Sequence, residues 1–142
     1  MDRNSVILAA LAPSRGKFLT PVQIQKLLFL IDRNVPEKIQ GPHFDFQPYH
    51  YGTFDKSIYS LLDELAEKKL IQIIETGCSW KKYGLTPEGQ SIAESYLNSL
   101  DEKTRAYIQR LSNFVLALSF EQLVSAIYKA YPEMKQNSVF KE

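Results

Sequence analysis

The stretch 51–71, YGTFDKSIYSLLDELAEKKLI, places the strongest constraint on the fold. In it a glycine, Gly52, is followed at once by the pattern of an amphipathic helix. Its apolar residues fall within one arc when they are projected at about 100° per residue. These residues are Phe54, Ile58, Leu61, Leu62 and Leu65. Thr53 stands where it can cap the first turn. The pattern predicts a helix that begins after Thr53 and buries one face.

Capping residues and prolines indicate five further helices. Thr20 and Gln23 form a capping-box pattern around Pro21, which suits the first position of a helix. Ser119 and Gln122 repeat the box near the end of the chain. The expected helices cover about residues 5–12, 21–33, 87–100, 102–116 and 119–131.

Two segments have the character of strands. Phe44, Phe46, Tyr49 and Tyr51 alternate around Pro48, which predicts one or two short extended pieces. Residues 71–73 and 80–85 flank ETGCS, and this arrangement predicts a β-hairpin with Cys78 at its turn.

The order helix, helix, helix, hairpin, helix is that of a winged helix-turn-helix. We therefore expect a mainly α fold with a small β-hairpin, extended by two C-terminal helices. The 44% of hydrophobic residues are enough for one core. We expect a single domain over 1–142, with its core at about 5–100 and the extension at about 101–133. The tail 135–142 is expected to be frayed.

Composition limits the partners and the compartment. The net charge of +1 counts against nonspecific DNA binding, which needs a basic surface. A single cysteine fits a reducing cytosol. There is neither a signal-peptide pattern nor an apolar run of about 20 residues, so we expect a cytoplasmic protein without a membrane partner.

No pattern indicates an enzyme. The six glycines are scattered and form no phosphate-binding loop. Cys78 has no nucleophile signature around it. His43, Asp45 and His50 do not have the spacing of a closed zinc site. We expect no catalytic residues, no metal site and no cofactor.

The helix after Gly52 is a weak candidate for reading DNA. Its outward ridge is expected to carry Lys56, Ser60, Asp63 and Glu67. Phosphates would repel the two carboxylates, and major-groove readers usually present Arg, Lys, Asn or Gln. A solvated face explains this ridge better.

The predicted hairpin, which would be the wing of a winged helix-turn-helix, is the better candidate for binding nucleic acid. Its edge carries Trp80, Lys81, Lys82 and Tyr83. The lysines could neutralise phosphate of duplex DNA, and an aromatic ring could stack on a base. In the alternative interpretation, the two rings pack on the core and the lysines are solvated.

Two apolar surfaces could bind a partner protein. The helix at 21–33 is apolar nearly all round, because Val22, Phe29 and Leu30 fall outside its core arc. Either the C-terminal helices cover it, or it forms a homodimer or partner surface. The second surface is the aromatic strip, defined as Phe44, Phe46, Tyr49 and Tyr51, because tyrosine is enriched at interfaces.

Two segments resemble a known bacterial family. LTPVQIQKLLFLID is similar to a KLQKLLYLAD-type helix, and FQPYHYGTFDKSIYSLLDELAEKKLI resembles a YGPFS-containing block. Both are typical of the SocA-like or Panacea antitoxin domains and their YwgA-like relatives. LSFEQLVSAIYKAYPEM resembles a later helix of these proteins, so the likeness spans about residues 20–134. Thr53 stands where family members commonly have proline.

The resemblance implies a winged-helix-like fold without a catalytic centre. Some members of the family act as antitoxins that bind a toxin, and at least one type resembles an adaptor that delivers its toxin to a protease. The expected function is a non-enzymatic protein-interaction module of antitoxin or proteolytic-adaptor type. The alternative is a winged-helix transcriptional regulator that binds duplex DNA as a dimer.

Overall fold

The computed structural model describes residues 1–77 and 80–140. Within these residues the chain forms six α-helices and two antiparallel two-stranded sheets. The predicted class, mainly α with a small β-hairpin, is confirmed. The elements follow the expected order of helix, helix, helix, hairpin, helix, and a small two-stranded sheet lies between the second and third helices.

The helices are α1 (Arg3–Leu11), α2 (Pro21–Asn34), α3 (Ser57–Glu67), α4 (Pro87–Asn98), α5 (Glu102–Ala117) and α6 (Phe120–Ala130). The strands are β1 (Gln47–Tyr49), β2 (Gly52–Phe54), β3 (Ile71–Glu75) and β4 (Lys81–Leu85). Strand β1 pairs with β2, and β3 pairs with β4. Short 3-10 helices occupy Ala12–Ser14, Pro36–Lys38 and Pro132–Lys135.

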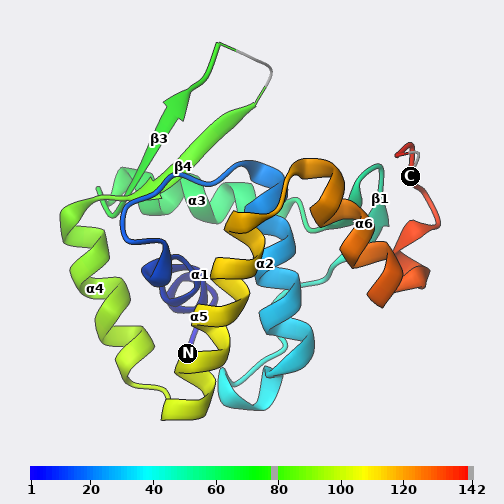
Figure 1. Ribbon diagram of the computed structural model, residues 1–142. Helices are drawn as coiled ribbons and strands as arrows, with labels where there is room; N and C mark the ends of the chain where they lie inside the picture. Colours follow the sequence, from blue (N-terminus) through cyan, green and yellow to red (C-terminus); the bar gives the residue numbers. More distant parts are fainter. Residues whose placement is uncertain (78–79, 141–142) are drawn as a thin grey trace.

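Helix α2 is central, and its predicted start is confirmed. The Thr20 hydroxyl accepts from the Gln23 backbone N–H, and the Gln23 side chain accepts from the Thr20 N–H at 2.9 Å. Residues 24–32 are all buried. Helices α5 and α6 pack against it (Figure 1). Phe29 is 1% exposed, and its ring packs against those of Phe46 and Tyr131. The C-terminal helices therefore cover one side of α2, as one interpretation expected, whereas Val22 near its start is only half-buried.

The predicted start of α3 was wrong. Thr53 lies in β2 instead of capping the helix, and α3 begins four residues later, at Ser57. The N-cap residue is Lys56, and its side chain makes no capping hydrogen bond. The Asp55 carboxylate, two residues before the helix, accepts from both the backbone N–H and the hydroxyl of Ser57. The outward ridge of α3 is exposed as predicted, at Lys56, Ser60, Asp63 and Glu67.

The β3–β4 hairpin is anchored at its base and projects from the helical body (Figure 1). Leu19 and Tyr83 exchange two backbone hydrogen bonds, of 2.8 and 2.9 Å. Helix α4 then returns against the entrance of β3. A Cβ atom on Gly89 would lie 1.8 Å from the Leu70 carbonyl oxygen, so only glycine permits this approach.

Residues 135–140 of the C-terminal tail, which was expected to be frayed, contact the body of the protein; residues 141 and 142 lie outside the described residues. The Val139 backbone N–H donates to the His50 carbonyl, and the Phe140 ring packs edge-on against Phe120 at 5.9 Å. The segment Pro132–Lys135 forms a 3-10 turn that buries Met134. The tail therefore closes over the turn between β1 and β2.

Candidate partner-binding groove and the Lys26 cavity

An apolar groove of about 550 Å³ lies where the start of α2 meets α6 and the hairpin. Its lining is predominantly apolar. The residues that line it are Thr20, Pro21, Val22, Gln23, Tyr51, Trp80, Leu118, Phe120 and Leu123. We call it the apolar groove.

Three aromatic residues of the apolar groove are exposed to solvent over about two fifths of their surface or more. Tyr51 is 43% exposed, Trp80 is 47% exposed and Phe120 is 39% exposed. Tyr51 and Phe120 meet edge to face, with ring centroids 5.1 Å apart. Exposed aromatic rings around a depression are typical of protein-binding sites.

The structure divides the predicted aromatic strip. Phe46 is half-buried and packs edge-on against Phe29 of α2, with centroids 5.4 Å apart. Phe44 is also half-buried, beneath the Arg3 guanidinium at 5.1 Å. Both rings therefore pack against the body of the protein. Tyr49 and Tyr51 are the exposed members, and of the four residues only Tyr51 lines the apolar groove.

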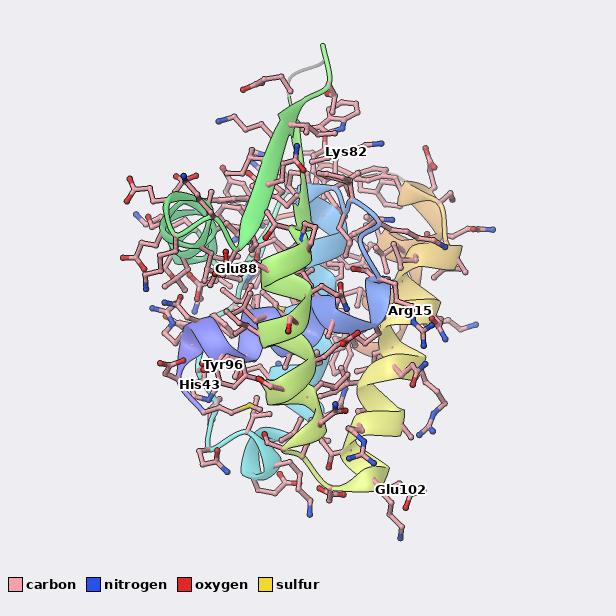
Figure 2. The ribbon with its side chains drawn as sticks, turned by 90° about the vertical axis from the view of Figure 1, so that its left-hand side faces the viewer. Arg15, His43, Lys82, Glu88, Tyr96 and Glu102 are labelled. Atoms are coloured by element: carbon pink, nitrogen blue, oxygen red, sulfur yellow. The ribbon has the colours of Figure 1, made fainter. Side chains whose placement is uncertain are left out.

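The four predicted wing residues are also divided. Trp80 lines the apolar groove, whereas Tyr83 is 5% exposed and packs in the core at the base of the hairpin. The Lys81 ammonium lies 3.9 Å from the Glu75 carboxylate. Lys82 is half-buried along the hairpin (Figure 2). Cys78, predicted at the turn, lies outside the described residues.

Sequence reasoning missed Lys26, a fully buried lysine on α2. Its side chain is 2% exposed, and its ammonium donates one hydrogen bond, to the Thr53 carbonyl at 3.1 Å. Burial lowers the pKa of the Lys26 amine to about 7. A signal was present, because Val22, Phe29 and Leu30 are its helical neighbours at i−4, i+3 and i+4.

A cavity of about 130 Å³ opens beside Lys26, and we call it the Lys26 cavity. It is lined by Val22, Gln25, Lys26, Tyr49, Tyr51, Gly52, Thr53, Phe54 and Tyr59. Val22 and Tyr51 also line the apolar groove, so the two depressions adjoin. Gln25 holds the β2 side of the cavity in place through two hydrogen bonds with the Asp55 backbone, of 2.9 and 3.0 Å.

The histidines and Asp45 are placed apart. The His43 ring contacts the Ile39 carbonyl at 2.6 Å, while the His50 ring stacks on Tyr49 with centroids 4.3 Å apart. The Asp45 carboxylate accepts from the Gln47 side chain. Across residues 1–77 and 80–140, no group of three or more His, Cys, Asp or Glu side chains could hold a metal ion.

No protein-family model and no curated protein matches the chain. In the part of the chain that the structure describes, every helix is too short or too polar to cross a membrane.

Proposed function

We propose that this protein is a non-enzymatic interaction module that binds a partner protein in the apolar groove. It would act in the cytoplasm as an antitoxin or proteolytic adaptor, so that a toxin is the expected partner. Binding would occlude the partner or deliver it to another protein, with no bond chemistry.

The observation that carries the proposal is the exposure of Tyr51, Trp80 and Phe120 around one apolar depression. These residues come from the β1–β2 turn, the hairpin and α6, which are far apart in sequence. Aromatic anchors contribute most to binding when they enter a well-packed centre surrounded by less critical contacts. The resemblance to SocA-like domains supports the same class of function.

The DNA-binding alternative has less support. Tyr83 is buried and cannot stack on a base, and Lys81 already lies near Glu75. The exposed ridge of α3 carries Asp63 and Glu67, which phosphate would repel.

A photo-crosslinking amino acid at position 120 tests the proposal. Phe114 provides the matched control, because it is an exposed phenylalanine on α5, 45% exposed, and does not line the apolar groove. We expect position 120, but not position 114, to cross-link one stoichiometric protein in the native host.

The purified partner then permits a direct measurement of affinity. Phe120→Ala should weaken binding by about 2 kcal/mol, the range of an aromatic anchor, and Phe114→Ala should leave it unchanged. Equal losses for the two variants, or cross-linking at neither position, would contradict binding in the apolar groove.

A further inference from the structure

The Lys26 cavity keeps open space beside a buried amine. Gly52 has a φ of +101°, and a Cβ atom there would lie 3.2 Å from the Lys26 Nζ and 3.4 Å from the Tyr128 ring. Any larger residue at this position would enter the space next to the amine. The exposed rings of Tyr49 and Tyr51 line the same cavity, so it opens to the surface.

Polar hydrogen-bonding capacity remains unused around this space. An ammonium group has three donors, and among the described residues Lys26 uses one, on the Thr53 carbonyl. Among the described residues, neither the buried hydroxyl of Thr53, which lines the cavity, nor that of Tyr128, whose ring lies beside Gly52, has a hydrogen-bond partner. Buried polar groups of this kind normally have partners, because leaving one unpaired costs about 1–3 kcal/mol.

The environment of Lys26 favours an anion. No acidic residue lines the Lys26 cavity, and none of the described carboxylates forms an ion pair with the amine. Asp55 directly follows β2, and its carboxylate accepts from the N–H groups of Asp45 and Ser57. A buried cation without a counter-ion is complementary to an incoming negative group.

We propose that the Lys26 cavity is the subsite for a carboxylate carried by the partner segment that occupies the apolar groove. This inference rests on the proposed function. The two depressions share Val22 and Tyr51, so one short segment can reach both. A carboxylate has two oxygens and can accept from the Lys26 ammonium and from a hydroxyl together. The segment would therefore be apolar, with one Asp, Glu or C-terminal carboxylate.

Proton linkage gives the subsite a characteristic pH dependence. A bound carboxylate stabilises the charged amine, so binding takes up a proton and weakens as the pH rises through about 7. The other titratable side chains that line the cavity or pack beside it are Tyr49, Tyr51, Tyr59, Tyr128, His50, Asp55 and Lys135. Of these residue types only histidine ordinarily titrates near neutrality. His50→Gln is therefore the control for the pH profile.

The subsite can be tested without the partner. Benzoate, benzamide and inorganic phosphate would be titrated into protein labelled with ¹³C at the lysine ε carbons, and the Lys26 signal would be followed. We expect benzoate to raise the pKa of Lys26 and to bind more tightly than benzamide by about tenfold, because a charge-assisted hydrogen bond is lost with the amide. Lys26→Met should abolish the preference, and Thr53→Val should reduce it.

A peptide library tests the connection between the two depressions. Peptides selected on the protein should contain a carboxylate beside apolar residues, and Asp→Asn or Glu→Gln in a peptide should weaken binding about tenfold. The same change should have no effect on the Lys26→Met protein, because the two groups form one pair.

The outcomes separate the two proposals. In one outcome benzoate binds at Lys26, but no selected peptide is weakened by Phe120→Ala. The cavity would then be an anion site, and both the partner-borne carboxylate and binding in the apolar groove would be overturned. Peptides that need Phe120 but do not depend on a carboxylate would retain the groove and overturn the subsite. Equal binding of benzoate and benzamide, or preferred binding of phosphate, would also overturn the carboxylate subsite. Circular dichroism of each variant confirms that the fold is intact.

Discussion

The two small hairpins of this protein are held in different ways. Strands β3 and β4 have five residues each and are fixed at their base by the backbone bonds between Leu19 and Tyr83 and by apolar packing. Strands β1 and β2 have three residues each and, in the part of the chain that the structure describes, pair with no other strand. Side chains of α2 hold them instead: Gln25 bonds the Asp55 backbone and Lys26 bonds the Thr53 carbonyl.

This difference bears on where function can reside. An apolar base lets the longer hairpin extend outward and present Trp80 to the apolar groove. A short hairpin held by buried side chains brings polar atoms into the interior, and some of them remain unpaired. Unpaired buried polar atoms are a cost to stability and an opportunity for a ligand.

The largest effect is expected at the base of the longer hairpin. Gly89→Ala would place a Cβ atom 1.8 Å from the Leu70 carbonyl oxygen, a backbone atom that cannot move alone. We expect a loss of unfolding free energy of about 3 kcal/mol or more in urea denaturation. Gly16→Ala is the control, since its Cβ would meet nothing within 4 Å and only the φ of +84° opposes it. A loss for Gly89→Ala no larger than for Gly16→Ala would show that α4 is not tightly seated on β3.

The shorter hairpin should be most sensitive at Gln25. Gln25→Ala removes the acceptor of the buried Asp55 N–H, whereas the Asp55 carbonyl still accepts from the Ile58 N–H. The expected cost is about 1–3 kcal/mol in the free energy of unfolding. Gln72→Ala, at an exposed position of β3, should change it by less than about 0.5 kcal/mol. Comparable losses for the two variants would contradict the different attachment of the two hairpins.

Lys26→Met should change how stability depends on pH. The folded-state pKa of Lys26 is about 7, and the ordinary value for an unfolded chain is 10.5. Between these values the unfolded state binds more protons, so the wild type gains stability with rising pH, at most about 1.4 kcal/mol per pH unit. The wild type should gain about 1–2 kcal/mol relative to Lys26→Met between about pH 7 and pH 8.5, measured by urea denaturation. Parallel pH profiles would show that Lys26 remains charged in the folded protein.

Trp80→Ala should have the smallest effect on stability. Its side chain is 47% exposed beyond the anchored base of the hairpin, so the free energy of unfolding should change by less than about 0.5 kcal/mol. Partner affinity should nevertheless fall, because Trp80 lines the apolar groove. A large loss of stability without a change in affinity would assign Trp80 to packing.

The predictability of each element follows from the range of its interactions. Local signals located α2 and α6, because both have a capping box, which acts within four residues, and α2 also has a proline at its first position. The start of α3 could not be found in this way. Thr53 is a good capping residue, but its pairing with Pro48 places it in β2, and the helix begins after Lys56 instead.

The candidate sites show the same limit. The sequence singled out Tyr51 and Trp80 but assigned them to separate surfaces, and only the fold brings them to one groove with Phe120. It also grouped Tyr51 with Phe44 and Phe46, which pack on the body of the protein. Phe46 packs against Phe29, and Phe44 lies beneath the Arg3 guanidinium. The assignment to SocA-like domains and the winged-helix arrangement stay predictions.

The sequence by itself determined that the six helices exist, that residues around 71–85 form a hairpin, and that α2 is apolar, since these depend on periodicity and on signals from neighbouring residues. The tertiary structure alone decided the environment of Lys26. An amine on a helix can reach water until another segment covers it. Here β2 covers the Lys26 amine with Gly52, whose φ is +101°, and with Thr53, which lies 27 positions further along the chain. Burial of a charge is a long-range property, which no local pattern fixes.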